Sequence, residues 1–161
     1  MNKNLHIVQP SLIDILSLPG LFRKAVHEEY KVYDRETRRR IVERHSLIHL
    51  LIARYKPGRT MLLALHDKTC VGVLLASHSS DGIGIINWIY VLPKYRKRNI
   101  AKKLLARVEK EFIKYNCHKL IVTTEVAQSF YRKIGYTQEA ILKKHWWNKD
   151  FYLFYKSLKN K

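Results

Sequence analysis

The chain has 161 residues and carries 31 lysines and arginines against 13 acidic residues, for a formal net charge of +18. Its hydrophobic content of 47% excludes an intrinsically disordered chain and predicts one folded domain over residues 1–161 with a buried core. The 2 cysteines exclude a disulfide scaffold and favour a reducing compartment. No apolar run reaches the roughly 20 residues of a membrane span, and the N-terminus lacks a signal-peptide pattern, so we expect a cytoplasmic protein with no membrane partner.

The first third of the chain predicts one strand and two helices. Residues 5–10 alternate apolar and polar side chains and end at a proline, as a strand does. Residues 11–30 have a helical period, which we expect to be broken by the proline–glycine pair at 19–20. Asp34 can cap a second helix that runs to about Tyr55. The apolar face of this second helix is predicted to contain Ile41, His45, Ile48 and Ile52.

The middle of the chain predicts an antiparallel meander followed by a helix. Three apolar runs separated by turn residues are the expected strands, at residues 60–67, 70–78 and 83–92. A helix is expected from Asn99 to about Tyr115. Its apolar stripe consists of Ile100, Leu104, Val108 and Phe112.

The last third predicts strands around one short helix. Residues 118–126 are rich in β-branched side chains, and the short helix that follows is closed by Gly135. A final hairpin is expected over residues 141–158, with its turn at 148–150 and with Trp146 and Trp147 on opposite faces of its first strand. The strand–helix–strand unit at residues 83–123 should place two strands parallel, so we predict a mixed α/β sheet.

Positive charge gathers where it is normally unfavourable, at the start of the helix that follows residue 99. Five cations lie there: Arg96, Lys97, Arg98, Lys102 and Lys103. The N-terminus of a helix already carries about half a positive charge, so these side chains repel it. A bound polyphosphate would reverse this repulsion, because free backbone N–H groups and cations both favour an anion. The sequence therefore predicts a polyphosphate site at this helix.

Two motifs give this site a family resemblance. The run from Arg96 to Ala101 fits the pattern Q/R-x-x-G-x-G/A, with Asn99 in place of the first glycine, and Ala-x-x-Phe-Tyr-x-Lys-x-Gly-Tyr follows from Ala127 to Tyr136. Together they resemble the GNAT superfamily of acetyl-CoA-dependent N-acetyltransferases, over nearly the whole chain. The resemblance implies a mixed, mostly antiparallel central sheet with helices on both faces. It also implies acetyl-CoA as co-substrate and transfer of the acetyl group to a primary amine by direct attack in a ternary complex.

The resemblance also implies roles for individual residues. The amides of the phosphate loop would cradle the coenzyme A pyrophosphate: Arg96, Lys97, Arg98, Asn99, Ile100 and Ala101. Backbone groups of Ile89, Tyr90 and Val91 would run along the pantetheine arm. Thr124 stands where many members have an asparagine that contacts the pantetheine region. Tyr131 stands where the family keeps a tyrosine near the coenzyme sulfur, with the proposed role of general acid for the leaving thiolate.

The sequence departs from the family in its general base. Many members carry a glutamate where this chain has Asn87, and an amide cannot take a proton. Glu125, His78 and His145 are the alternatives, and a base acting through water or an amine that arrives neutral stays equally open. Asn99 is a second departure, although asparagine tolerates the left-handed backbone that the replaced glycine would adopt.

The acceptor and the partners are not fixed by the sequence. The basic surface favours an amine carried on an anionic partner, such as a charged tRNA, a ribosomal protein or an acidic small molecule. A cluster at Arg38, Arg39 and Arg40 is either solvated or in contact with an acidic acceptor. The alternative is a catalytically weak module that binds nucleic acid through its basic surface. Monomer and homodimer both remain open, and no metal site is expected, because His45 and His49 lack a third ligand at a recognisable spacing.

Overall fold

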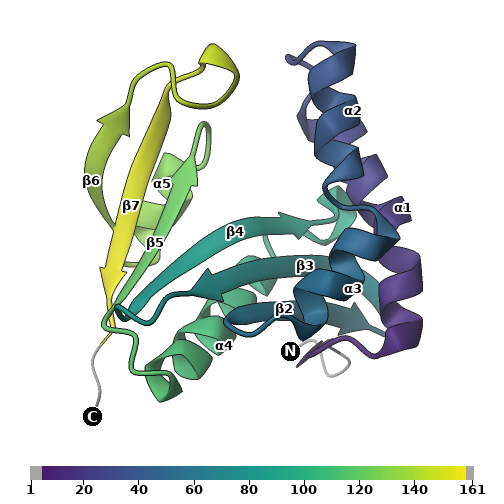
Figure 1. The fold of residues 1–161 in the computed structure, drawn as a ribbon, viewed down its shortest axis with the longest axis horizontal. Helices are drawn as coiled ribbons and strands as arrows, with labels where there is room; N and C mark the ends of the chain where they lie inside the picture. Colours follow the sequence, from purple (N-terminus) through teal and green to yellow (C-terminus); the bar gives the residue numbers. More distant parts are fainter. Residues whose placement is uncertain (1–4, 159–161) are drawn as a thin grey trace.

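A computed structural model describes residues 5–158 of the chain (Figure 1). Its centre is a 7-stranded sheet in the order β1-β2-β3-β4-β5-β7-β6. The strands are β1 Leu5–Val8, β2 Arg59–His66, β3 Thr69–His78, β4 Ile83–Val91, β5 Lys119–Thr124, β6 Thr137–Leu142 and β7 Phe151–Ser157. The pair β4–β5 is parallel and the other pairs are antiparallel, so the predicted mixed, mostly antiparallel α/β sheet is confirmed.

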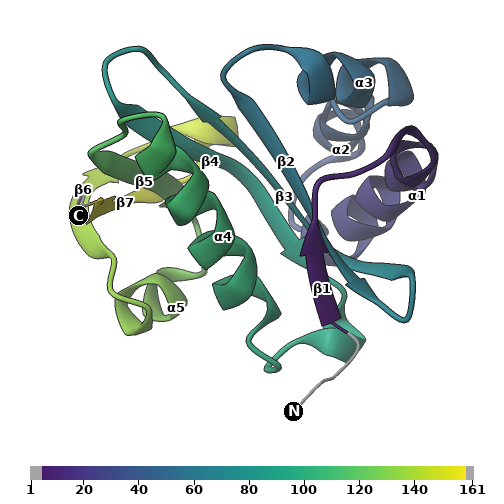
Figure 2. The same ribbon diagram turned by 90° about the horizontal axis from the view of Figure 1, so that it is seen from below.

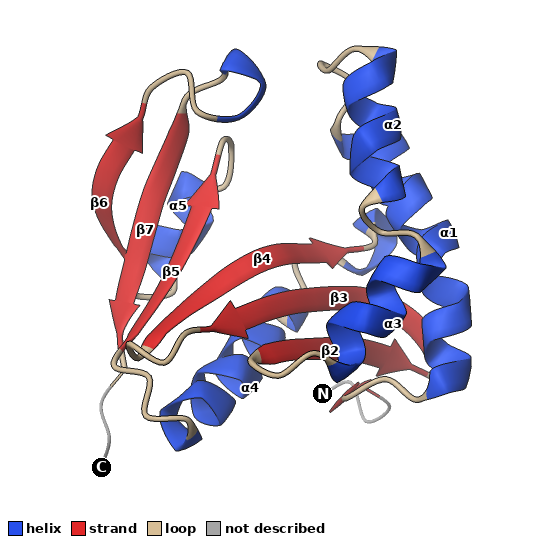
Figure 3. Ribbon diagram, viewed as in Figure 1, coloured by secondary structure: helices blue, strands red, loops and turns tan. Residues whose placement is uncertain are grey.

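Helices cover both faces of this sheet, as Figures 2 and 3 show. They are α1 Leu12–Glu29, α2 Arg35–Glu43, α3 Leu47–Tyr55, α4 Ile100–Lys114 and α5 Gln128–Lys133, with short 3₁₀ helices η1 Pro93–Tyr95 and η2 Trp146–Asn148. Helices α1 and α3 lie on one face, and α4 lies on the opposite face (Figure 2). None of the helices among residues 5–158 combines the length and apolar character that crossing a bilayer requires.

Two hydrophobic cores hold the layers together. The predicted stripe of α4 is confirmed, because Ile100, Leu104, Val108 and Phe112 are all buried against the sheet in the larger core. The close approach of α4 depends on Gly84 in β4, where an added Cβ would lie 2.3 Å from Cδ2 of Phe112. The second core, on the other face, packs α1 and α3 onto β2 and β3.

The first helix runs through the proline–glycine pair, contrary to the predicted break. Pro19 lies inside α1, which extends without interruption from Leu12 to Glu29. A proline inside a helix costs about 3 kcal/mol. Here the fully buried side chains of Ile15 and Leu18 precede the proline and that of Phe22 follows it, so core burial on both sides offsets this cost.

The predicted second helix is two helices, and its predicted apolar face is wrong in part. Residues 44–46 separate α2 from α3, and the extended backbone of Ser46 starts the new helix. The break changes which face points inward, because Leu50 of α3 is buried while Ile48 and Ile52 are 69% and 57% exposed. Ile41 of α2 is buried as predicted.

The final hairpin has a longer connection than the predicted turn. Strand β6 ends at Leu142, and residues 143–150 form a loop that contains η2. Trp146 and Trp147 therefore lie in the loop and not on a strand, which corrects the prediction. Asp150 closes the loop by accepting hydrogen bonds from Nζ of Lys143 at 2.7 Å and from the backbone N–H of Lys144 at 3.0 Å.

Strands β4 and β5 diverge, and this separation positions the candidate site (Figure 1). Their parallel pairing covers only four residue pairs, from Ile83–Lys119 to Ile86–Val122. Beyond Ile86, β4 continues to Val91 with no strand on its β5 side within residues 5–158. The register between β3 and β4 shifts at the same place, so that Asn87 forms a bulge. A bulge bends its strand, which helps to turn β4 away from β5.

Candidate active site

A cavity of about 1610 Å³ occupies the space where β4 and β5 diverge. Its walls come from helices α2 and α3 with the turn before them, the start of β2, the second half of β4, the start of α4, the end of β5, helix α5 and the β6–β7 loop. All of the predicted cofactor-binding and catalytic residues except Arg98 line it, and of the candidate bases His78 does not. The cavity therefore joins the phosphate loop to the second motif, as a substrate site shared by both would require.

The loop before α4 presents free backbone donors. Lys97 and Asn99 both have left-handed backbones, with φ of 59° and 60°. Asn99 is the N-cap of α4, and its side chain makes no capping hydrogen bond. Among residues 5–158, the first N–H in this region that finds a helical acceptor is that of Lys103, which donates to the carbonyl of Asn99 at 3.0 Å, so the amides from 97 to 102 remain free. Free amides at a helix N-terminus fit the phosphates of a bound nucleotide.

Unlike the free amides that follow it, the N–H of Arg96 is already hydrogen-bonded within the protein, and so is its guanidinium. Its N–H donates to the carbonyl of Pro93 at 3.1 Å, so the free amides begin one residue later than the motif suggests. Its guanidinium donates from Nε to the carbonyl of Val91 at 3.0 Å and pairs through Nη2 with Glu29 at 2.5 Å. Arg96 therefore connects the loop to the end of α1 and of β4.

The second half of β4 offers one unpaired backbone edge to the cavity. Ile89, Tyr90 and Val91 pair on their other side with residues of β3. The side chain of Tyr90 is buried in the second core, and its hydroxyl donates to Glu28 at 2.7 Å. Burial and this hydrogen bond raise the pKa of Tyr90. Because the N–H of Leu92 donates to the carbonyl of Val71 in β3, the backbone groups of Tyr90 also face β3, and those of Ile89 and Val91 face the cavity.

The end of β5 and the second motif bring Thr124 and Tyr131 to the opposite wall. Tyr131 on α5 is 3% exposed, and its ring packs against Tyr136 and Phe154. Burial raises the pKa of Tyr131, which keeps its hydroxyl protonated at neutral pH. The hydroxyl of Thr124 accepts a hydrogen bond from the N–H of Ala127 at 2.9 Å and so holds the turn that precedes α5.

The structure separates the candidate bases. Asn87 accepts a hydrogen bond from Oγ of Ser77 at 3.0 Å, and as an amide it supplies no base. His78 lies outside the cavity, stacked on Tyr115 with 4.6 Å between ring centroids. Glu125 and His145 both line the cavity. Glu125 accepts a hydrogen bond from the hydroxyl of Tyr33.

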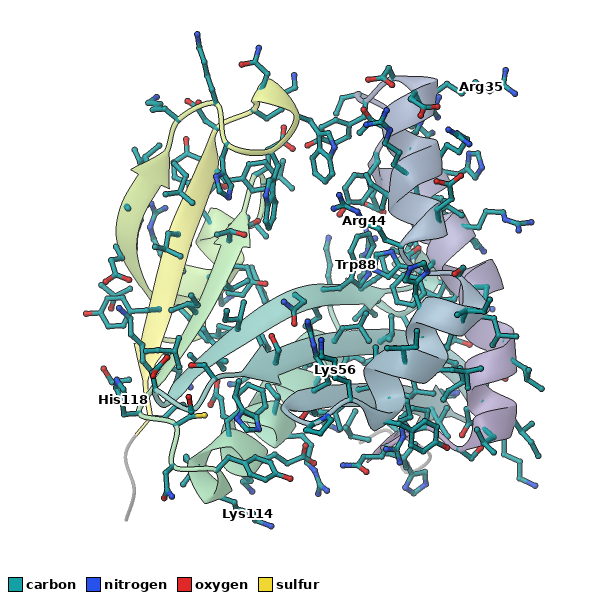
Figure 4. All side chains as sticks on the ribbon, viewed as in Figure 1. Arg35, Arg44, Lys56, Trp88, Lys114 and His118 are labelled. Atoms are coloured by element: carbon teal, nitrogen blue, oxygen red, sulfur yellow. The ribbon has the colours of Figure 1, made fainter. Side chains whose placement is uncertain are left out.

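A row of aromatic side chains at the site was largely missed by the sequence analysis. The rings follow one another as Trp88, Tyr30, Tyr33 and Trp147, with neighbouring centroids 5.5, 5.6 and 5.1 Å apart. Figure 4 shows Trp88 on β4 beside the helices. Of these side chains, the sequence analysis singled out only Trp147, which it placed on a strand. The signal for the others was the pair of tyrosines at 30 and 33, which stand in a largely polar stretch of sequence from His27 to Arg40.

The fold and the site define an acyltransferase-type domain with a split sheet. Residues 21–136 match the model of the Acetyltransferase (GNAT) family, and the chain belongs to this family, which confirms the resemblance seen in the sequence. A comparison with curated protein sequences gives no match.

Solved structures share the fold over almost the whole chain. The PaiA N-acetyltransferase of Thermoplasma acidophilum, in complex with coenzyme A, is 20% identical with a TM-score of 0.78, and covers 95% of this chain and 98% of its own. A GNAT-family acetyltransferase of Staphylococcus aureus Mu50 is 19% identical with a TM-score of 0.75, over 96% and 99%. The ribosomal-protein-S18-alanine N-acetyltransferase of Escherichia coli is 12% identical with a TM-score of 0.70, over 98% and 96%.

Proposed function

We propose that the protein is an acetyl-CoA-dependent N-acetyltransferase that acetylates a primary amine by direct attack. The observation that carries this proposal is the placement of the free amides from 97 to 102 beside the unpaired edge of β4, in a chain of the GNAT family. The structurally similar protein of T. acidophilum was crystallised with coenzyme A, which supports the choice of co-substrate.

The phosphate end of the co-substrate would lie on the start of α4. The amides of Lys97, Arg98, Asn99, Ile100 and Ala101 would donate to the pyrophosphate oxygens, and the helix dipole would add to them. The neighbouring lysines at 102 and 103 would contribute positive charge without a fixed contact. Arg96 would position this loop through Glu29 and Val91, because its own side chain and amide are already engaged.

The pantetheine arm would follow the unpaired edge of β4. The backbone groups of Ile89 and the N–H of Val91 would pair with its amides as a neighbouring strand would, whereas the carbonyl of Val91 is held by Arg96 and the backbone of Tyr90 faces β3. The hydroxyl of Thr124 keeps a donor hydrogen while its oxygen holds the α5 turn, so it can donate to the arm from the opposite wall.

Acetyl-CoA supplies the acetyl group as a thioester, whose carbonyl carbon is attacked and whose sulfur departs. The nitrogen of a neutral amine forms the new C–N bond while the C–S bond breaks, and the proton that the nitrogen loses balances the one that the sulfur gains. A backbone N–H at the free edge of β4 would polarise the carbonyl. Tyr131 would donate a hydrogen bond to the departing sulfur and pass a proton to it as the C–S bond breaks, and burial, which raises the pKa of Tyr131, keeps the phenol protonated until then.

Calorimetry with acetyl-CoA and coenzyme A tests this proposal. We expect micromolar binding of both, and a protein that binds neither would overturn it. Ala101→Glu places a carboxylate among the free amides. This carboxylate would repel the negatively charged pyrophosphate, so binding should weaken by about tenfold or more. Ala106→Glu is the matched control: it adds the same charge to an exposed position of α4 outside the cavity and should bind as the wild type does.

A further inference from the structure

One side of the cavity contains a carboxylate next to a row of aromatic side chains. Tyr33 in the turn between α1 and α2 is 6% exposed, and its hydroxyl donates to Glu125 at the end of β5. Burial, then Glu29 and then Glu125 raise the pKa of Tyr30 to about 12. The rings of Trp88 and Trp147 extend the row on either side of Tyr30 and Tyr33. A carboxylate beside aromatic side chains is suited to an ammonium group, which ion pairing and cation–π attraction both favour.

Glu125 is also the carboxylate of the cavity that has no cation of its own. Among the described residues that line the cavity, the acidic side chains are Glu29 and Glu125. Glu29 is held by Arg96 at 2.5 Å. Glu125 makes its side-chain hydrogen bond with a neutral phenol, so its negative charge remains available for a ligand.

The wall formed by α2, α3 and β2 has the opposite charge. Arg44 follows α2, Lys56 follows α3, and Arg59 begins β2, and all three line the cavity. In residues 5–158, the side chains of Arg44 and Lys56 make no hydrogen bond or ion pair, and Arg59 reaches only the amide oxygen of Asn87 at 3.5 Å. Figure 4 shows Arg44 and Lys56 beside the central opening. This wall therefore carries positive charge that the protein itself does not neutralise.

We propose that the acceptor is a small molecule that carries both a primary amine and an anionic group. Its amine binds to Glu125 beside Tyr33, and its anionic group is attracted by the basic wall to which Arg44, Lys56 and Arg59 contribute. The inference rests on the proposed function, because it assigns the acceptor of that same reaction. A diamine has no anion for the basic wall and brings a second cation to it, so the same geometry rejects polyamines by repulsion.

Four amines with the same five-carbon chain test this inference. Pentylamine has no second charge, cadaverine has a second ammonium, δ-aminovalerate has a carboxylate and aminopentyl phosphate has a phosphate. Acetyl transfer and equilibrium binding are measured for each with the wild-type protein and acetyl-CoA. We expect the two anionic amines to exceed pentylamine by about tenfold in kcat/KM, as several partly exposed ion pairs together would give. Cadaverine should fall below pentylamine, and the comparison of carboxylate with phosphate identifies the preferred anion.

Matched variants separate this inference from a general effect of charge. The double variant R44Q/K56Q should lose the preference for anionic amines, measured as the ratio of kcat/KM for δ-aminovalerate to kcat/KM for pentylamine. K110Q removes one exposed cation of α4 outside the cavity and should keep the preference. E125Q should weaken the binding of all four amines. Circular dichroism confirms that each variant is folded.

Failure of this inference is distinguishable from failure of the proposed function. If acetyl-CoA does not bind, the proposed function fails. If acetyl-CoA binds but cadaverine or pentylamine matches the anionic amines, the acceptor class is wrong. The same conclusion follows if neither anionic amine binds at millimolar concentration.

Discussion

Nη2 of Arg96 lies 2.5 Å from Oε1 of Glu29, and this ion pair joins the phosphate loop to the last turn of α1. Their side chains are 43% and 37% exposed, so the pair should contribute less than about 1 kcal/mol to stability. Its larger effect should be on the loop. We expect Glu29→Gln to weaken coenzyme A binding several-fold by calorimetry while unfolding changes little. Glu43→Gln, which removes a carboxylate of α2 paired with Arg39, serves as the control, and equal affinities in the two variants would argue against this role.

Asn99 should be replaceable by glycine but not by alanine. Its φ of 60° is a left-handed backbone, which costs an ordinary side chain about 1–2 kcal/mol and glycine nothing. We expect Asn99→Ala to lower the free energy of unfolding by about 1 kcal/mol and to weaken coenzyme A binding. Asn99→Gly should bind at least as well as the wild type. Urea unfolding and calorimetry measure both effects, and an alanine variant indistinguishable from the wild type would show that the loop does not need this conformation.

Tyr131→Phe should reduce turnover and spare binding. The phenyl ring keeps the contacts with Tyr136 and Phe154, so the fold and the affinity for coenzyme A should be preserved. Loss of the proton donor should lower kcat by about a hundredfold. Steady-state acetylation beside calorimetry makes the comparison, and equal rates for the two proteins would remove Tyr131 from the mechanism.

Gly84→Ala should be strongly destabilising. The new Cβ would lie 2.3 Å from Cδ2 of Phe112, so α4 or the sheet would have to move, at a cost of about 1–3 kcal/mol. Gly20→Ala is the matched control, since an added Cβ there meets nothing within 4 Å inside helix α1. That change should stabilise the protein by about 0.5–1 kcal/mol. Denaturant unfolding gives both values, and similar effects at the two glycines would contradict the packing of α4.

Tyr30 should make the protein sensitive to alkaline pH. Its pKa is raised from 10.0 to about 12, first by burial and then by Glu29 and Glu125. The folded state holds this proton more tightly than the unfolded state, so the stabilisation is complete below about pH 10 and is lost as the pH rises toward 12. Tyr30→Phe should therefore reduce the slope with which the unfolding temperature falls between about pH 10 and pH 12, measured by thermal unfolding at a series of pH values. Tyr55→Phe, at a 63% exposed position, should leave the slope unchanged, and the same slope in all three proteins would contradict the assignment.

The features that could be predicted from the sequence are those that local sequence patterns determine. The stripe of α4, the meander and the parallel strand pair follow from periodicity and turn residues, and the structure confirms all three. The polyphosphate site inferred from the cations around Arg96 stays a prediction. The break between α2 and α3 was not predictable in this way, because residues 44–46 contain no proline or glycine. The predicted break in helix α1 was wrong for the opposite reason. Pro19 is a strong local signal for a break, but core packing on both sides of it overrides that signal.

Local patterns could not predict how Tyr33, Glu125 and Trp147 come together on one side of the site. Tyr33 and Glu125 are 92 positions apart in the chain, and only the divergence of β4 from β5 and the turn after α1 bring them together. Trp147 meets Tyr33 because the β6–β7 connection is a closed loop and not the tight turn that was predicted. Glu125 was a candidate from its position beside the second motif, but its aromatic surroundings come from three separate segments.

The hydrogen bond between Tyr33 and Glu125 also limits how an amine can bind there. One oxygen of this carboxylate already accepts the phenol hydrogen, so the protein orients the carboxylate before a ligand arrives. The other oxygen keeps its full acceptor capacity for an ammonium donor. The phenol of Tyr33 thereby fixes the side of Glu125 that an incoming amine meets, whatever lies at the far end of the acceptor.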